Sequence, residues 1–394
     1  MSRKFFRVII PVLIVIEFFS IFLSIKSFIN RDLKEIKEEH AIDKENYGMY
    51  IQNDEGKYVE YTDSVFFPEG YDLNLEKSSC VDVKGNAIND ILSINETSIT
   101  MVSNKTAYCY LYFDVDVPIA GEWLLESQPA NLNTELEGGL YRYQGTADAV
   151  NNNYICFGTT DKNTCVGDTD KYMYRIIGIN ESMQLKLIKK EALNSMYYWH
   201  NSYIPNSPWP DSDLYKGLNG IAGGNYSNVF INNNNYSYML KDSNWYNKIA
   251  DISWKYGDTS TYNTTAINIY NIENGFTNTV VAKIGLWYMH DYYYGIAGGN
   301  NCSDYGSYSR CKSSWIHLSN NDPNAPVQNY ETYEWTMTRR NLSQGMYTAW
   351  YPNSYGYVEY SIVSVTGPVR PVFYLNADIT LSGSGTTDDP YIIN

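Results

Sequence analysis

The histidines are the first residues to consider, because histidine supplies the base in many nucleophilic and acid–base sites near neutral pH. His200, His290 and His317 occur in "YWHNS", "YMHDYY" and "WIHLS", each among aromatic residues, a setting typical of a packed structural histidine. Asp291 follows His290, but adjacent residues of a strand point to opposite faces. No G-x-S-x-G turn accompanies any of them. The sequence therefore indicates no serine-type triad, and we expect no catalysis.

Carboxylates are the next candidates, since the chain contains 44 Asp and Glu residues. The carboxylate pair of a glycoside hydrolase is defined by spacing in the fold, so the sequence singles out no pair. A secreted hydrolase with dispersed acids stays an alternative. The loops "NNDPNAP", "WPDSD" and "TTDDPY" carry oxygen ligands of the kind Ca²⁺ uses, but Asp-Pro and Asn-Pro are also ordinary turn formers. We predict no metal and no cofactor, with calcium as the alternative.

The stretch "YEWTMTRR" combines aromatic residues, an acid and two arginines. If it is a strand, Glu334, Thr336 and Thr338 form a polar face and Trp335 belongs to an apolar one. This pattern predicts a half-buried strand with Trp335 in the core. We expect one of the two arginines to pair with a buried carboxylate other than Glu334. The stretch is thus interpreted as architecture.

Exposed aromatic residues provide the predicted ligand site. The segment "SMYYWHNSYIPNSPWPDSD" (195–213) concentrates aromatic residues among Pro, Ser and Asn. Binding residues gather on loops, and exposed rings stack on sugars or peptides. The alternative is that the loop folds over the core and buries them. The predicted ligand-binding residues are Tyr197, Tyr198, Trp199 and Trp209.

The cysteines predict an oxidising compartment. Sequence proximity favours nearest-neighbour pairs, and the later two pairs close short polar loops. Metal sites need closer spacing with histidines nearby, so we expect disulfides and a location outside the cytoplasm. The predicted pairs are Cys80 with Cys109, Cys156 with Cys165, and Cys302 with Cys311.

An apolar segment near the N-terminus predicts a membrane anchor. "VIIPVLIVIEFFSIFLSI" (8–25) has about 18 mostly apolar residues, follows Arg3, Lys4 and Arg7, and lacks an A-x-A cleavage site. We predict a single-pass anchor over 1–28, with the remainder extracellular. The net charge of −15 argues against nucleic acid as a partner.

Glu17 interrupts this apolar segment, where a carboxylate is costly unless it is paired. A lone Glu in such a helix resembles the type IV pilins, but the Gly of their processing junction is absent. A structural subunit of a surface filament therefore stays an alternative function. A charged helical stalk is expected over 29–46.

Two extracellular regions follow. Short alternating segments such as "GKYVEY", "SITMV" and "AYCYLYFDV" predict a small β spacer domain over 47–117. Residues 118–137 carry no strong period and are expected to be a linker. The region 138–394 combines many short strands with few helices, among them short ones near Ser212 and Ser243, and predicts an α+β, β-rich domain.

Several segments of this last region carry a resemblance. They are, in order, "GLYRYQGT", "YICFGT", "YMYRIIGI", "QLKLIKK", "WPDSDLYKGLN", "AKIGLWYMHDYYYG", "YEWTMTRR" and "VRPVFYL". Together they resemble an uncharacterised domain of surface proteins from low-GC Gram-positive bacteria. That family resembles the C-type-lectin-like fold shared with formylglycine-generating enzymes, in which an E-W-T strand and a late Arg-containing strand belong to the core.

The resemblance implies a lectin-like fold over 138–394 and a surface location. Formylglycine-generating activity needs reactive cysteines near the C-terminus, whereas the last cysteine here, Cys311, is expected to pair with Cys302. We therefore predict a membrane-anchored extracellular binding or adhesion protein. Its ligand is expected to be a glycan, a peptide or another protein.

Overall fold

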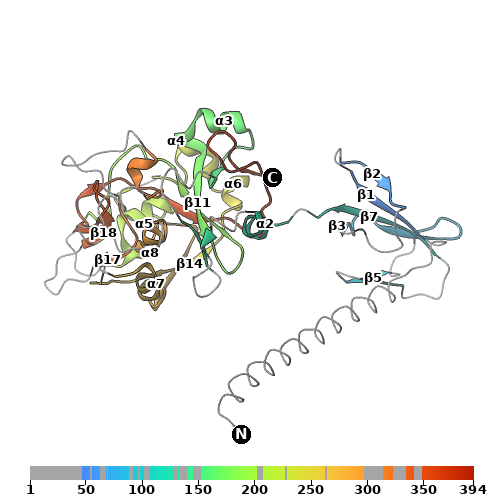
Figure 1. Cartoon of the computed structure of the whole chain (residues 1–394), viewed down its shortest axis with the longest axis horizontal. Coiled ribbons are helices and arrows are strands. Elements are labelled where there is room, and N and C mark those ends of the chain that lie inside the picture. The colour runs from blue at the N-terminus through green and yellow to red at the C-terminus, as the bar shows by residue number, and fades with distance from the viewer. Residues whose placement is uncertain are drawn as a thin grey trace, which may run out of the picture. The chain divides into compact units, whose positions relative to one another are not determined.

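The structure is a computed structural model, and it describes residues 47–394 with gaps (Figure 1). The gaps are 54–55, 63–67, 69, 88–91, 96–97, 102–106, 117, 128–131, 134–139, 145–151, 202–206, 227–228, 262–263, 297–313, 323–333 and 341–347. The chain divides into an N-terminal unit, Met1–Val117, and a C-terminal unit, Pro118–Asn394. The predicted anchor over 1–28 and stalk over 29–46 lie outside the described residues.

The described part of the N-terminal unit is built from short strands, as the alternating segments predict. Four of them form a sheet in the order β2-β1-β7-β3, β4 pairs with the long strand β7, and β5 and β6 form a separate hairpin. β1 and β7 run parallel, whereas the other neighbours are antiparallel. The strands are β1 (Tyr47–Gln52), β2 (Tyr58–Glu60), β3 (Tyr71–Leu73), β4 (Ser79–Asp82), β5 (Leu92–Asn95), β6 (Ser98–Met101) and β7 (Ala107–Val115).

A disulfide reinforces the small core of this unit. Met49, Leu111 and Phe113 are buried together with Cys80 and Cys109, which face each other across β4 and β7 and form the predicted disulfide. A core this small provides little hydrophobic stabilisation, so a covalent cross-link contributes a large share of the stability.

A central sheet organises the C-terminal unit, in the order β16-β21-β12-β11-β9-β8, with β10 pairing β11. Every residue of β11 and β12 is buried, so both faces of the sheet centre are covered. These two strands lie in the segments "YMYRIIGI" and "QLKLIKK", on either side of "NES". The strands of this sheet are β8 (Leu132–Asn133), β9 (Tyr141–Tyr143), β10 (Tyr154–Cys156), β11 (Met173–Ile179), β12 (Leu185–Lys189), β16 (Ile284–Gly285) and β21 (Val372–Tyr374).

Short helices lie beside the sheet. α8 packs next to β9, and α5 next to β16. Short helices are present near Ser212 and Ser243, as predicted, and the side chains of these two serines cap α5 and α6. The helices are α2 (Ala120–Ser127), α3 (Lys162–Gly167), α4 (Thr169–Tyr172), α5 (Asp213–Leu218), α6 (Asn244–Asn247), α7 (Ala266–Asn274) and α8 (Met289–Tyr294), with 3₁₀ turns η1 (Trp209–Asp211), η2 (Asn234–Met239) and η4 (Leu318–Asn320).

Smaller strand pairs complete the unit, which is therefore β-rich with several sheets and short helices, an α+β architecture. The last residues of the chain return to the sheet, because Tyr391 exchanges backbone hydrogen bonds with Tyr154 and Cys156, and both Tyr391 and Ile393 are buried. The additional strands are β13 (Tyr197–Tyr198), β14 (Ile252–Tyr256), β15 (Asn278–Ala282), β17 (Arg339–Arg340), β18 (Thr348–Pro352), β19 (Val358–Ile362), β20 (Thr366–Gly367), β22 (Leu381–Ser382) and β23 (Ile392–Ile393).

The structure differs from the expected linker over 118–137. Within it, α2 buries Ala120 and Leu124 in the main core of the C-terminal unit, and Leu132 of β8 joins them. The segment is short and lacks an obvious apolar period, but these apolar side chains are enough to hold it on the core.

The segment containing Glu334 and Trp335 also differs in part from its prediction. Trp335 is buried as predicted, but Glu334, Thr336 and Thr338 are buried too, so the segment is no half-buried strand. The polar side chains find partners inside: Arg370 binds Glu334 through Nε at 2.9 Å and Nη2 at 2.7 Å. The predicted arginine partner is Asp258, which contacts Arg339 at 2.6 and 2.7 Å, but its side chain is 31% exposed and not buried as expected.

Candidate functional site

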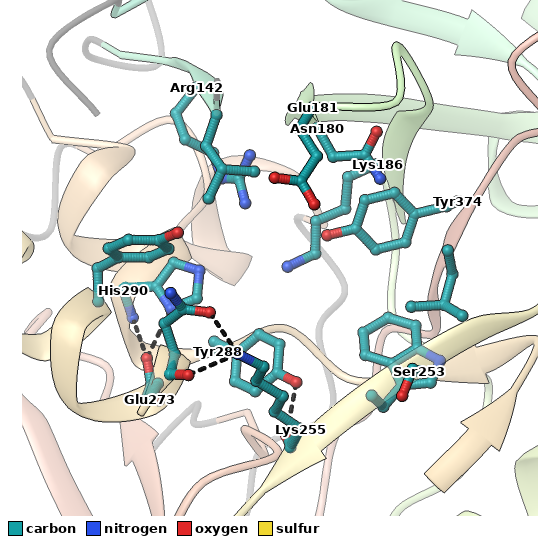
Figure 2. Close-up of a pocket in the computed structure, with 15 residues that line it drawn as sticks. Arg142, Asn180, Glu181, Lys186, Ser253, Lys255, Glu273, Tyr288, His290 and Tyr374 are labelled. Atoms are coloured by element: carbon teal, nitrogen blue, oxygen red, sulfur yellow. Dashed lines mark hydrogen bonds and ion pairs between the residues drawn. The ribbon is translucent and has the colours of Figure 1, made fainter. Parts of the chain in front are cut away.

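A pocket in the described part of the C-terminal unit, called the large pocket below, has a volume of about 410 Å³. It lies where β9, β12, β14 and β21 meet α7 and α8. Figure 2 shows Lys186 and Tyr374 directed toward its centre from one side, with Glu273 and His290 on the other. Its charged and aromatic lining residues are Arg142, Glu181, Lys186, Trp254, Lys255, Tyr270, Glu273, Tyr288, His290 and Tyr374.

Asp291 is the buried anion behind this pocket. Its Oδ1 lies 3.2 Å from Arg142 Nε, and its Oδ2 accepts a hydrogen bond from Lys186 Nζ at 2.5 Å. Oδ2 also accepts the backbone N–H of Tyr288 at 2.8 Å, which caps α8. Burial alone would raise the pKa of Asp291, but the charges of Lys186, His290 and Arg142 outweigh it and hold the pKa well below its ordinary value. Asp291 is therefore ionised and fully engaged.

A glycine makes room for Arg142. Gly178 lies at an irregularity in the pairing of β11 with β12 and pairs with Arg142 on β9. A Cβ atom at position 178 would lie 2.0 Å from the carbonyl oxygen of Tyr141 and 2.8 Å from Arg142 Nη1. Any larger residue would displace the guanidinium, so this glycine positions the arginine in the pocket wall.

Lys186 lies in a box of aromatic rings. Its Nζ is 4.9 Å from the ring centre of Tyr288, 5.6 Å from that of Tyr374 and 6.0 Å from that of Trp254. The lysine side chain is fully buried. The ring faces offer a cation favourable electrostatics, and Asp291 supplies the opposite charge. This arrangement compensates for the loss of hydration of the ammonium group.

Glu273, at the end of α7, holds His290 in place. Its Oε2 lies 2.7 Å from His290 Nδ1, and its oxygens accept the backbone N–H groups of Met289 and His290 at 3.1 and 3.0 Å and the hydroxyl of Thr338. A carboxylate only accepts hydrogen bonds, so Nδ1 carries a proton. The imidazole stacks on Tyr288 with ring centres 5.1 Å apart.

The atoms left to meet a ligand include two donors. Among the described residues, Arg142 Nη2 and the Tyr374 hydroxyl have no hydrogen-bond partner, whereas His290 Nε2 lies 3.5 Å from Asp291 Oδ1. Glu273 and Asp291 already accept several hydrogen bonds each. The site is therefore suited to binding a group that accepts hydrogen bonds, and neither of these two carboxylates is free to act as a general acid or base.

The predicted ligand residues lie elsewhere. The expectation that Trp199 and Trp209 are exposed is wrong, because they are 0% and 1% exposed. Trp199 donates its indole N–H to the carbonyl of Thr336 at 3.1 Å and packs against Trp209 with ring centres 5.4 Å apart. The loop folds over the core. Tyr197 and Tyr198 are half-buried, and neither lines the large pocket.

His290 and Asp291 were noted in the sequence but placed on opposite faces of a strand. They belong to helix α8, and the two side chains approach to 3.5 Å between Nε2 and Oδ1. A further signal was available in "GLYRYQGT" and "QLKLIKK". Each places a basic residue, Arg142 or Lys186, inside an apolar strand segment, which indicates a buried cation that needs a partner.

Two of the three predicted disulfides are confirmed, namely Cys80–Cys109 and Cys156–Cys165. Cys302 and Cys311 lie outside the described residues. Across the parts of the chain that the structure describes, no group of three or more His, Cys, Asp or Glu residues is arranged to hold a metal ion.

In the same described ranges, no helix combines the length and apolar character needed to cross a membrane. Comparison of the chain with family models, with curated proteins and with solved structures finds no match in any of the three. The functional argument therefore depends on the geometry of the site.

Proposed function

We propose that this protein is a membrane-anchored extracellular binding protein whose C-terminal unit is a lectin-like domain, and that the pocket beside α8 binds an acidic sugar of a glycan. The anchor is residues 1–28, and residues 47–117 form the spacer. Disulfides persist in oxidising compartments, and the two in the described residues support an extracellular location. The rival role as a filament subunit depends on residues 1–46, which lie outside the described residues.

The ligand chemistry follows from the unsatisfied donors. Arg142 Nη2 and the Tyr374 hydroxyl line one pocket and suit a carboxylate. Ser253 and Asn274 at the same pocket supply a hydroxyl and an amide N–H that suit sugar hydroxyls. Pockets for small ligands range from about 300 to 1,000 Å³, so this one matches one or two sugar rings.

The carboxylates at the pocket separate this proposal from the hydrolase alternative, because Glu181 is the one lining acid that has no hydrogen-bond partner among the described residues. A glycoside hydrolase needs one carboxyl group that gives up a proton and one that attacks or activates water. Glu273 is held by two backbone amides, a histidine and a threonine, and Asp291 by two cations and an amide. Both are structural anions, and this favours binding.

Titration calorimetry with matched sugar pairs tests the proposal. Glucuronic acid should bind about 10-fold or more tightly than glucose, because a hydrogen bond to a charged group contributes about 1.5–3 kcal/mol. Tyr374→Phe removes one donor and keeps the ring, so it should weaken glucuronic acid binding about 3- to 10-fold. Tyr360→Phe is the matched control, since Tyr360 is 44% exposed and does not line the pocket. Equal affinity for glucose and glucuronic acid would contradict the proposal.

A further inference from the structure

A serine, a histidine and an aspartate meet at a second place in the C-terminal unit, away from the large pocket. Ser207 Oγ lies 3.1 Å from His200 Nε2, and His200 Nδ1 lies 3.0 Å from Asp213 Oδ2. Both distances are within hydrogen-bonding range, and the order of atoms is that of a nucleophile, its base and an orienting acid. Such a constellation is recognised by geometry, so the absence of a G-x-S-x-G turn does not exclude it.

Asp213 is fixed as the orienting acid. Its Oδ2 accepts the backbone N–H of Asn201 at 2.7 Å, and its Oδ1 accepts that of Asn225 at 2.8 Å. Burial acts to raise the pKa of Asp213, but these amide hydrogen bonds and His200 outweigh it and lower the pKa. The aspartate is therefore an anion at neutral pH and can stabilise an imidazolium beside it.

Hydrogen bonds to their own backbone atoms hold His200 and Ser207 in place. The backbone N–H of His200 donates to the carbonyl of Val363 at 3.0 Å, and the carbonyl of Ser207 accepts from Arg339 Nη1 at 2.6 Å. Asp258 clamps Arg339 through two contacts of 2.6 and 2.7 Å. The approach of His200 Nδ1 to Asp213 lacks the alignment of a full hydrogen bond. Catalytic hydrogen bonds in unliganded enzymes commonly tighten only when substrate binds.

A small cavity of about 130 Å³ begins at the residue that follows Ser207. Pro208, Trp209, Met337 and Arg339 line it. The indole N–H of Trp209 is buried and has no hydrogen-bond partner among the described residues. A buried donor without a partner is costly, so this N–H is available to donate to an acceptor on a bound molecule. A volume of this size holds a short acyl group.

We propose that Ser207, His200 and Asp213 hydrolyse short-chain acyl esters. Ser207 Oγ bonds to the carbonyl carbon while its proton passes to His200 Nε2, and the carbonyl electron pair moves to oxygen. When the tetrahedral intermediate collapses, the bond to the alcohol breaks and the alcohol takes the proton from Nε2. Water then repeats the sequence on the acyl-serine, which releases a carboxylic acid and restores Ser207. This activity does not depend on the sugar-binding pocket.

Reaction of the full chain with a fluorophosphonate ester probe tests the assignment. Peptide mass spectrometry should locate the adduct on Ser207, and Ser207→Ala should abolish it. His200→Gln should slow labelling about 100-fold or more while the serine remains, because the base is lost. Ser361→Ala is the control, since this β19 serine is far in sequence and lines neither pocket.

Hydrolysis of p-nitrophenyl acetate provides the second readout. Turnover should fall in both Ser207→Ala and His200→Gln and stay at the wild-type rate in Ser361→Ala. Unfolding midpoints of all variants show whether each is folded. Labelling spread over several serines, or labelling of Ser207 at the same rate in His200→Gln, would overturn the proposal, because the histidine would then not activate the serine.

Discussion

Asp291 in the pocket wall and Glu334 in the sealed core are both buried carboxylates paired with arginine, and their pKa values move in opposite directions. Asp291 contacts two cations, Arg142 and Lys186, and lies near His290, and its pKa is lowered. Glu334 has one cation, Arg370, and an indole N–H from Trp287 at 2.9 Å. Burial raises the pKa of Glu334 despite the attraction of Arg370.

The number of cations in contact with a buried carboxylate decides the direction of its pKa shift in this protein. One bidentate arginine does not outweigh the desolvation of Glu334, whereas two cations outweigh that of Asp291. Arg142 and Lys186 at the pocket therefore share a single counterion, Asp291. This arrangement favours the binding of a further negative group. The core pair is closed on itself and, with the hydrogen bond from the backbone N–H of Trp335 to the carbonyl of Pro368, ties residues 334–338 to the segment before β21.

The largest expected effect on the free energy of unfolding comes from removing Arg370, because no second cation among the described residues contacts Glu334. Arg370→Met leaves Glu334 as a buried charge with no cation in direct contact and should lower the free energy of unfolding by about 3–5 kcal/mol. Urea denaturation followed by tryptophan fluorescence measures this in the C-terminal unit. Combining it with Glu334→Gln removes the orphaned charge and should restore part of the loss. A loss below about 1 kcal/mol in Arg370→Met would contradict the conclusion that Glu334 depends on this single cation.

A smaller effect is expected for Lys186→Met, because Asp291 keeps Arg142 and the amide of Tyr288. We expect a loss of about 2 kcal/mol in the free energy of unfolding, less than for a pair left with no cation. Lys248→Met is the control. Lys248 also lies over an aromatic ring, that of Trp245 at 6.0 Å, but it is partly exposed and its substitution should change stability by less than about 0.5 kcal/mol. A Lys186→Met loss as large as that of Arg370→Met would show that Arg142 does not compensate.

The smallest effect is in the pH dependence of stability. The pKa of Asp291 is lowered on folding, so its contribution is present above its ordinary pKa of about 3.9 and is lost as the pH falls toward its lower folded value. The pKa of Glu334 is raised, so its contribution to stability declines as the pH rises from its ordinary value of about 4.3 through the folded value.

Unfolding curves at a series of pH values separate the two carboxylates. Asp291→Asn should flatten the stability profile below about pH 4, and Glu334→Gln should flatten it just above that value. Identical changes in the two variants would contradict the opposite shifts.

Local features of the fold could be predicted from the sequence. Close spacing predicted the disulfide of Cys156 with Cys165, and the segment around Ser212 predicted the short helix α5. Each of these depends on residues that are near one another in the chain, so propensity and loop closure suffice to indicate them.

The pocket could not be predicted in this way. Arg142 and Asp291 are 149 residues apart, and Lys186 and Asp291 are 105 apart, so no spacing rule relates them. The aromatic loop misled for a related reason, since Trp199 and Trp209 are buried by residues such as Thr336 that are distant in sequence. Composition shows that a segment is aromatic, and only tertiary packing decides whether it faces solvent.

The return of the chain end to β10 sets the order in which the C-terminal unit is completed during synthesis. Tyr154 and Cys156 cannot form their backbone hydrogen bonds until Tyr391 has been made, more than 200 residues later. At the usual speed of a ribosome this delay is on the order of tens of seconds. For that time β10 lacks the backbone hydrogen bonds that Tyr391 supplies. A polypeptide that completes its fold late can still pass unfolded through a translocation channel. Late completion of the C-terminal unit is therefore compatible with the export proposed above.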